Sequence, residues 1–485
     1  MTPPKPRYRV FLAILIALIA AGATVCGFLV GRSTAHDSYV QKVSALVTTE
    51  NSMTWLYPAI GAQIDDPVTA EALAKLYGVR LGDRDALVRR LSEVAWVPAY
   101  GPAPFVGNGA RPMLGDDPHI NILGFRDERQ SYVTKADRTV RVFMTGGSTA
   151  WGSGASSQKN TISYILERIL NQRMSPVTGF RYEVINTAFP AWSTTQEKLL
   201  IQQRLLDLHP DVILMFSGNN DVHWSRDGRD VRWFYAPMDD NHVALLNELY
   251  RSSGHPEWVS PMLSSGRPIE CTDVAPITAR NVEEAAIAAS GVKARLMFAL
   301  QPNVATTAKR LTKREQQLPE MQNKPYWESC YRALRDRLRH VRARNYRLID
   351  LSRIFGEVDG ETELFVDSYH FADAGNRLVA QALADQIDWR SIVPSAAVRP
   401  DPAKALKIIS ASPADASGTV RIVPNRVDKR LLVIFDTSVL PTDVSSDAIT
   451  ATIPAGLRTA TGKHRISIVD GLTGETSPPV AFQIR

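Results

Sequence analysis

Between about residues 140 and 390, short apolar runs alternate with segments whose apolar residues recur every three or four positions. The apolar runs are typical of strands and lie at 140–144, 182–185, 212–216, 295–300 and 346–351. The periodic segments are typical of amphipathic helices and lie at 162–170, 198–208 and 375–387. The run VILMF has no polar residue, which indicates a strand buried on both faces. This alternation predicts an α/β domain over 121–395, in which helices cover both faces of a parallel sheet in three layers.

The pattern changes after residue 400. Short strand-like runs are separated by turn residues, with no helical pattern between them, and lie at 407–410, 420–424, 431–435, 449–453, 465–469 and 480–484. We therefore predict a small all-β sandwich over 403–485. The two prolines in Arg399-Pro400-Asp401-Pro402 favour a stiff boundary before it.

The N-terminal region begins with an uncharged run, residues 10–30, which as a helix would span roughly 30 Å, about the thickness of a bilayer core. We predict a single transmembrane helix. Basic residues precede the run, so the N-terminus is expected to be cytoplasmic and the bulk of the chain extracytoplasmic, or periplasmic in a Gram-negative cell. A cleaved signal peptide is the alternative, although its apolar core is usually only about 7–15 residues long. Residues 37–120 are expected to form a lead-in region, helical to about residue 100 and irregular from there.

Composition narrows the functional classes. The chain has 485 residues, 44% of them hydrophobic and 22% charged, which is ordinary for a globular protein and argues against disorder. A net charge of +6 over this length, without an arginine-rich tract or zinc-ligand spacing, gives no basis for a nucleic-acid partner. No cofactor is expected, and no metal either, because the spacing of His223, Asp367 and His370 fits no common zinc pattern. Cys271 and Cys330 either pair in an oxidising compartment or remain two free buried thiols.

Three loops carry residues suited to acyl-transfer chemistry. Ser148 lies in MTGGSTAWG just after the run at 140–144, and Asn220 lies in SGNND after VILMF. Asp367 and His370 lie in FVDSYHFADAGN, before the last helical segment. An aspartate can orient an imidazole that activates a serine hydroxyl, and an asparagine amide can donate to an oxyanion. Taken singly, these residues read equally as a helix-capping serine, an Asn-Asp turn and a structural Asp–His pair.

In combination, these blocks resemble the SGNH subgroup of GDSL-type hydrolases. The resemblance covers about residues 121–387 and includes NILGFRD at 121–127. It implies that Ser148 is the nucleophile, His370 its base and Asp367 the orienting carboxylate. It also implies an oxyanion hole formed by the Ser148 backbone N–H, the Asn220 amide and the Ala191 backbone N–H in INTAFPAW, residues 185–192. There the chain departs from the family pattern, because Ala191 stands where glycine is usual, and its methyl group narrows the space at this donor.

The resemblance implies an extracytoplasmic serine esterase or O-acyltransferase that moves an acyl group, such as acetyl, from a carbohydrate or other ester through an acyl-serine intermediate. The motifs do not separate hydrolysis from transfer. The alternative is a non-catalytic, membrane-tethered binding or assembly protein. The C-terminal sequence RISIVDGLTGETSPPVAFQI resembles immunoglobulin-like modules of the IPT/TIG type, which implies a protein partner for that module.

Overall fold

The computed structural model describes residues 64–94, 100–114, 118–232, 246–256, 266–399, 404–415, 417–458 and 463–483. The chain divides into two compact units, one made of residues 1–59 and 241–258 and the other of residues 60–240 and 259–485. In the first unit, the described part is helical over residues 246–252. The predicted transmembrane segment, residues 10–30, lies outside the described residues. Within the described ranges, no helix combines the length and the apolar character that crossing a bilayer requires.

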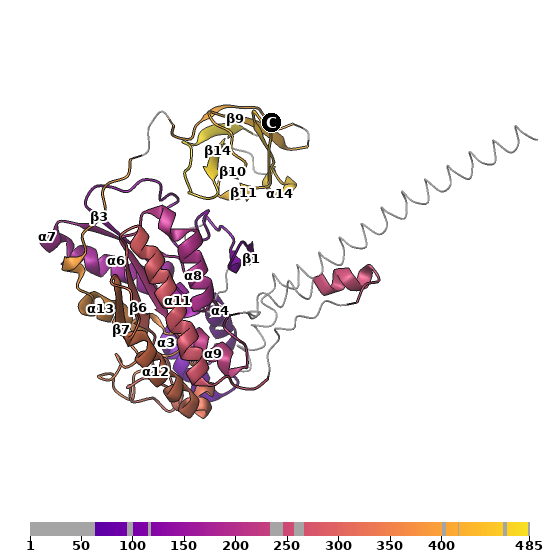
Figure 1. The fold of residues 1–485 in the computed structure, drawn as a ribbon. Coiled ribbons are helices and arrows are strands. Elements are labelled where there is room, and N and C mark those ends of the chain that lie inside the picture. Colours follow the sequence, from indigo (N-terminus) through magenta and orange to yellow (C-terminus); the bar gives the residue numbers. More distant parts are fainter. Residues whose placement is uncertain are drawn as a thin grey trace, which may run out of the picture. The chain divides into compact units, whose positions relative to one another are not determined.

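A five-stranded sheet, parallel throughout, forms the centre of the second unit (Figure 1). Its strand order is β4-β3-β5-β6-β7. The strands are β3 (Thr139–Gly146), β4 (Arg181–Asn186), β5 (Val212–Ser217), β6 (Arg295–Leu300) and β7 (Tyr346–Asp350). All five coincide with predicted runs to within two residues at either end. The predicted α/β class with a parallel sheet is therefore confirmed.

Helices cover the sheet on both faces, so that it lies between two hydrophobic cores (Figure 1). Along β5, alternate side chains enter opposite cores, as the wholly apolar sequence requires. The helices α6 (Ile162–Arg173) and α13 (Asp373–Gln386) contribute to one core. The helices α8 (Thr194–Gln203), α11 (Cys271–Gly291) and α12 (Lys324–Arg339) contribute to the other. Each fully buried Leu, Ile or Val side chain contributes about 1.5–3 kcal/mol to the stability of these layers.

Several short helical turns connect the main elements. They are α5 (Ser148–Trp151), α7 (Ser175–Thr178), α9 (Asn219–Arg226) and the 3-10 turns Gln158–Asn160, Leu205–Leu208, Glu315–Gln317, Pro319–Asn323 and Trp389–Ser391. The helix expected over 198–208 is in fact α8, which begins earlier, at Thr194, because Ser193 and Gln196 form a capping box. Its last four predicted residues form a separate 3-10 turn.

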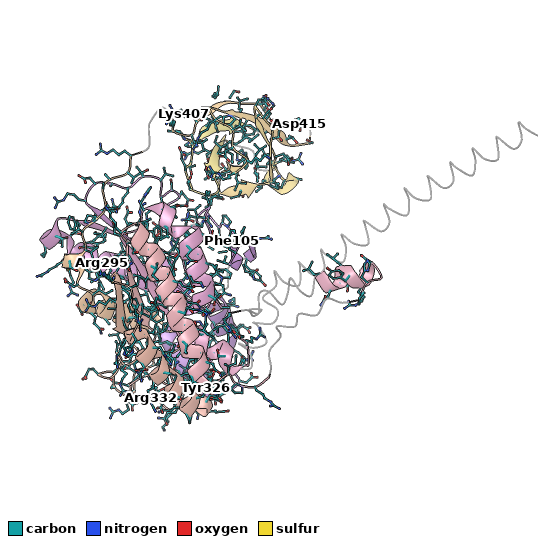
Figure 2. All side chains as sticks on the ribbon, in the orientation of Figure 1. Phe105, Arg295, Tyr326, Arg332, Lys407 and Asp415 are labelled. Carbon is teal, nitrogen blue, oxygen red and sulfur yellow. A yellow bond between two sulfur atoms is a disulfide. The ribbon has the colours of Figure 1, made fainter. Side chains whose placement is uncertain are left out.

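The lead-in region contains two helices, α3 (Pro67–Tyr77) and α4 (Arg84–Val94), in agreement with the predicted helical character of this stretch. The stretch expected to be irregular holds an antiparallel hairpin of β1 (Tyr100–Ala103) and β2 (Gly107–Ala110). The sequences YGPA and GNGA have low strand propensity, so their pattern gave no strand signal. Phe105 lies in the hairpin turn and is 70% exposed (Figure 2).

The C-terminal part consists of two four-stranded antiparallel sheets, with strand orders β11-β10-β14-β15 and β12-β13-β9-β8. Its strands are β8 (Ile408–Ala411), β9 (Thr419–Pro424), β10 (Leu431–Phe435), β11 (Ser438–Leu440), β12 (Thr442–Val444), β13 (Ile449–Thr452), β14 (Lys463–Asp470) and β15 (Val480–Gln483), with a short helix α14 (Ala455–Arg458). Both sheets contribute side chains to one hydrophobic cluster. The six predicted strands are present. Strands β11 and β12 were not predicted, because three residues are too few for a recognisable alternation.

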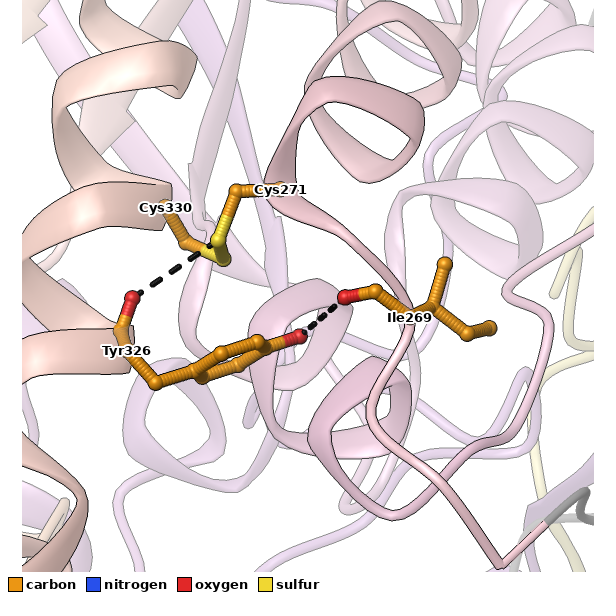
Figure 3. Close-up of a disulfide and its surroundings, with 4 residues drawn as sticks. All are labelled: Ile269, Cys271, Tyr326 and Cys330. Atoms are coloured by element: carbon orange, nitrogen blue, oxygen red, sulfur yellow. Dashed lines mark hydrogen bonds between the residues drawn. A yellow bond between two sulfur atoms is a disulfide. The ribbon is translucent and has the colours of Figure 1, made fainter.

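Cys271 and Cys330 form a disulfide, which decides between the two alternatives left open by the sequence (Figure 3). Their Cα atoms lie 4.7 Å apart, and the bond joins the first residue of α11 to α12. Beside it, the Tyr326 hydroxyl donates a hydrogen bond to the Ile269 carbonyl at 2.7 Å (Figure 3). The disulfide therefore ties together two helices that cover the same face of the sheet.

Candidate active site

The residues predicted to carry the chemistry meet at the carboxyl ends of the parallel strands. Ser148 follows β3 after a single residue, Gly147. Asn220 is the second residue of α9, which follows β5, the neighbour of β3 in the sheet. Open α/β sheets bind their ligands at this end, because the strand-to-helix loops converge there. His370 and Asp367 reach the same place from the loop that precedes α13.

Ser148, His370 and Asp367 form one hydrogen-bonded chain. The distance from Ser148 Oγ to His370 Nε2 is 2.7 Å, and the distance from His370 Nδ1 to Asp367 Oδ2 is 2.6 Å. An ionised carboxylate only accepts hydrogen bonds, so Nδ1 must carry the ring proton. Nε2 is then the acceptor for the Ser148 hydroxyl, which is the arrangement that a general base requires.

Asp367 is held as a carboxylate by its surroundings. Burial alone would raise its pKa, but the charge and hydrogen bond of His370, together with backbone N–H donors, outweigh burial and lower the pKa. The backbone N–H groups of Tyr369 and His370 donate to Asp367 Oδ1 at 2.8 and 2.9 Å. Both oxygens of Asp367 are thus occupied, which keeps the carboxylate aligned with the imidazole.

The side chain of Asn220 lies against the backbone that carries Ser148. A Cβ atom added at Gly147 would lie 2.2 Å from Asn220 Nδ2, which only glycine permits. Asn220 Nδ2 also donates to the Trp192 carbonyl at 2.7 Å. An amide nitrogen carries two hydrogens, so this bond orients the amide and leaves its second hydrogen for an oxyanion.

Ala191 has a left-handed backbone, with φ of 68°. For an L-residue this conformation costs roughly 1–2 kcal/mol, whereas glycine adopts it without this cost. Trp224 helps to hold the strained residue, because its indole Nε1 donates to the Ala191 carbonyl at 3.0 Å. Trp224, which follows the Asn220 block, is buried and supports this loop.

Buried acidic residues beneath the site tie these loops together, and sequence reasoning missed them. Asp221 accepts hydrogen bonds from the Thr194 N–H at 3.0 Å, the Thr194 hydroxyl at 2.5 Å and the Thr278 hydroxyl at 2.8 Å. It thereby joins α9 to the start of α8, next to Ala191. Glu197 accepts from the hydroxyls of Thr145 at 2.7 Å and Ser217 at 2.6 Å, which lie at the ends of β3 and β5.

A second buried polar group holds the loop that carries His370. Arg314 donates to the Val366 carbonyl at 3.0 Å and to the Phe365 carbonyl, and it pairs with Glu363 at 2.9 Å. Glu315 accepts from the Leu364 N–H at 3.0 Å. The side chains of Arg314 and Glu315 are almost fully buried. A run of charged residues between two elements looks like a solvated loop in sequence, so no local signal pointed to this role.

No group of three or more His, Cys, Asp or Glu side chains suited to a metal ion occurs among the described residues. His223, whose spacing with Asp367 and His370 fits no common zinc pattern, makes its hydrogen bond to the Tyr369 hydroxyl, at 2.8 Å, and not to His370 or Asp367.

The sequence matches no protein-family profile and no curated protein sequence at a significant level. The structure is similar to the acetyl xylan esterase AlAXEase, with 16% identity and a TM-score of 0.30 over 50% of this chain and 98% of that one. TesA gives 13% identity and a TM-score of 0.31 over 50% of this chain and 95% of TesA. Axe2, an acetylxylan esterase from Geobacillus stearothermophilus, gives 11% and 0.32 over 52% and 97%. Because these identities and TM-scores are low, the activity of this protein has to be inferred from its side-chain geometry.

Proposed function

We propose that this protein is a membrane-anchored, extracytoplasmic serine esterase or O-acyltransferase. The observation that carries the proposal is the hydrogen-bonded chain from Ser148 Oγ through His370 to Asp367, with distances of 2.7 and 2.6 Å. The Asn220 amide beside Gly147 supplies a donor where negative charge develops in acyl transfer.

In the first half-reaction, Ser148 Oγ attacks the carbonyl carbon of an ester while its proton passes to His370 Nε2. The carbonyl oxygen becomes an oxyanion that accepts hydrogen bonds from the Asn220 amide and the Ser148 backbone N–H. When the tetrahedral intermediate collapses, the bond to the leaving alcohol breaks, and His370 returns its proton to that alcohol. Asp367 stabilises the imidazolium in between. The product is an ester between the acyl group and Ser148.

In the second half-reaction, His370 Nε2 takes the proton of an incoming hydroxyl, whose oxygen attacks the acyl-serine carbonyl. The Ser148–acyl bond then breaks and Ser148 recovers its proton. Water as the acceptor gives hydrolysis, and an alcohol gives transfer. A carbohydrate is the acceptor or substrate that the family resemblance implies, with acetyl as the simplest acyl group.

The compartment is part of the proposal. An anchor at residues 10–30 with a cytoplasmic N-terminus would place the site outside the cytoplasm. The disulfide between Cys271 and Cys330 supports this location, because such bonds persist in oxidising compartments and are rare in the cytosol. The C-terminal sheets are proposed to form an immunoglobulin-like module that contacts a protein partner.

The test is p-nitrophenyl acetate turnover by the purified full-length protein and three variants. Ser148→Ala and His370→Ala should each lower kcat by about 10⁴–10⁶, because residues of a triad act as a unit. Arg173→Ala, which changes an exposed residue paired with Asp385, is the control and should match the wild type. Equal turnover by the wild type and Ser148→Ala would refute the proposal.

The alternative is a non-catalytic binding protein. One observation favours it: Ala191, in the block expected to supply the third oxyanion donor, has a strained left-handed backbone. Labelling with a fluorophosphonate distinguishes the two functions, because the reagent needs an activated serine. The esterase proposal expects a label on Ser148 in the folded protein that disappears in His370→Ala. A folded wild-type protein without the label would favour the binding function.

A further inference from the structure

A second histidine beside the site, His223, is oriented by a hydrogen bond at its Nδ1, as His370 is. His223 lies on α9, three residues after Asn220, and residues at this spacing share a helix face. Its Nδ1 lies 2.8 Å from the Tyr369 hydroxyl oxygen. That hydroxyl donates its own hydrogen to Glu320 Oε1. The Tyr369 oxygen must therefore accept from His223, which places the ring proton on Nδ1 and a lone pair on Nε2.

Glu320 is the buried end of the hydrogen-bonded chain that begins at His223, and further hydrogen bonds hold it in place. Its carboxylate also accepts hydrogen bonds from Arg226 and, at 2.5 Å, from the Trp327 indole nitrogen. Burial would raise the pKa of Glu320, but the hydrogen bonds from Arg226, Tyr369 and Trp327 outweigh it and lower the pKa. Glu320 is thus a carboxylate at neutral pH, as a pure hydrogen-bond acceptor should be.

The hydrogen-bonded chain of His223, Tyr369 and Glu320 runs from the buried Glu320 to the partly exposed His223. The side chain of Glu320 is 4% exposed, whereas that of His223 is 21% exposed and that of His370 is 19% exposed. Tyr369 directly precedes His370, and its ring centroid lies 5.3 Å from that of His223 and 6.4 Å from that of His370. Nε2 of His223 lies 3.8 Å from Asp227 Oδ2, beyond hydrogen-bond distance. Among the described residues, His223 Nε2 therefore makes no hydrogen bond, and its partly exposed side chain is linked through Tyr369 to the loop that carries His370.

Burial is the main reason that His223 stays in the neutral form. Burial lowers its pKa below the ordinary value of 6.5. The carboxylates of Asp227 and Glu320 act in the opposite direction, and the guanidinium groups of Arg226 and Arg229 act in the same direction as burial. At neutral pH, the unprotonated Nε2 is therefore able to accept a hydrogen bond from a bound molecule.

We propose that His223 Nε2 binds a second hydroxyl of a polyhydroxylated acceptor and so orients the hydroxyl that reacts at the acyl-serine. This inference rests on the proposed acyltransferase function and adds a positioning residue for its acceptor. The reacting hydroxyl gives its proton to His370 Nε2, and a neighbouring hydroxyl of the same acceptor donates to His223 Nε2. Water and alcohols with one hydroxyl cannot make the second contact, so the site favours vicinal diols such as those of sugars.

The test is a competition for the acyl-enzyme within one mixture. The full-length protein is supplied with p-nitrophenyl acetate and equal amounts of 1,2-propanediol and 1-propanol, and the two acetate esters are quantified. Their ratio depends only on the second half-reaction, so it is independent of how much enzyme is active. The wild type should favour the diol. His223→Asn keeps a donor for Tyr369 but has no atom at the position of Nε2, and it should lower the diol preference by about three- to tenfold, the range of one lost hydrogen bond.

Two further variants complete the design. His223→Gln returns a polar atom near the position of Nε2 and should recover part of the preference, which also covers the case in which the asparagine variant does not fold. His209→Asn is the matched control, because His209 lies before β5, at the opposite end of the strand, and asparagine tolerates its φ of 58°. Its ratio should equal that of the wild type.

The inference is overturned if the diol preference is the same in wild type and His223→Asn, if the wild type has no preference, or if only acetate forms. In all three cases Ser148-dependent release of p-nitrophenol would persist, so the esterase proposal would survive. If Ser148→Ala released p-nitrophenol as fast as the wild type, the proposed function itself would fail.

Discussion

At the scale of single residues, Gly147 decides whether Asn220 can serve the site. A methyl group at this position would overlap the Asn220 amide nitrogen, at 2.2 Å. Gly147→Ala should therefore displace the amide and lower kcat with p-nitrophenyl acetate by about 10²–10³, the usual effect of losing one oxyanion donor.

The control for this prediction is Gly291→Ala in α11, where an added Cβ would meet no atom within 4 Å. That variant should keep wild-type kcat. A Gly147→Ala protein that is equally active would show that the Asn220 amide does not contribute to turnover.

Glu197 should lower the free energy of unfolding as the pH rises, whereas a salt-bridged acid raises it. Burial raises its pKa from 4.5 to about 8, despite hydrogen bonds from Ser217 and Thr145 that lower it. Between these values the folded chain keeps the proton and the unfolded chain releases it. The stabilising effect is thus complete below pH 4.5, declines up to about pH 8 and changes no further above it.

Glu197→Gln removes this titration while retaining the size of the side chain. The free energy of unfolding of the wild type relative to the variant should fall between pH 5 and pH 8, by at most about 1.4 kcal/mol per pH unit. Urea denaturation of both proteins at intervals over this range measures the difference. A difference that stays constant would mean that Glu197 is already ionised in the folded protein at pH 5.

At the scale of elements, the loop before α13 is positioned by the segment that follows β6. Arg314 holds the carbonyls of residues 365 and 366 and pairs with Glu363, and the exposures of the two side chains are 1% and 16%. Arg314→Met leaves Glu363 without its cationic partner and two backbone carbonyls without this donor. We expect a loss of about 3–5 kcal/mol in the free energy of unfolding and a lower kcat, because His370 loses its support.

The matched control is Arg173→Met, whose ion pair with Asp385 is 2.8 Å long but half exposed on both sides. Such pairs contribute about 0–1 kcal/mol, and kcat should not change. Arg314→Lys keeps the charge without the forked geometry and should lie between the two. Denaturation and turnover measured on the same samples compare all three, and equal losses for Arg314→Met and Arg173→Met would contradict the prediction.

The elements that could be predicted from sequence are those whose signal is local. An apolar run such as residues 212–216 has few alternatives to a buried strand. Ser148 and Asn220 follow such strands, and His370 precedes a helix that its periodicity predicts. Glu197, Arg314 and Glu320 could not be predicted, because a charged residue is buried only when partners distant in sequence satisfy it. The hairpin of β1 and β2 depends on pairing between two glycine-rich segments, which their composition does not show.

At the scale of the whole molecule, the disulfide links stability to the proposed compartment. The bond between Cys271 and Cys330 closes a loop with a sequence separation of 59 residues, for which the chain-entropy relation gives roughly 4 kcal/mol of stabilisation. The double variant Cys271→Ala, Cys330→Ala should lose a similar free energy of unfolding in non-reducing buffer. The wild type in reducing buffer should match it.

Thiol titration tests the same bond without unfolding energetics. The chain has 3 cysteines, so the unreduced, denatured full-length protein should titrate one thiol, that of Cys26, because 3 − 2 = 1. Cys26→Ser should titrate none before reduction and two after it. Protein isolated from its native compartment with alkylated thiols should give the same count, because an oxidising environment forms the bond before extraction. Three reactive thiols in that sample would contradict the disulfide and remove the main structural support for an extracytoplasmic site, while leaving the Ser148 chemistry to its own test.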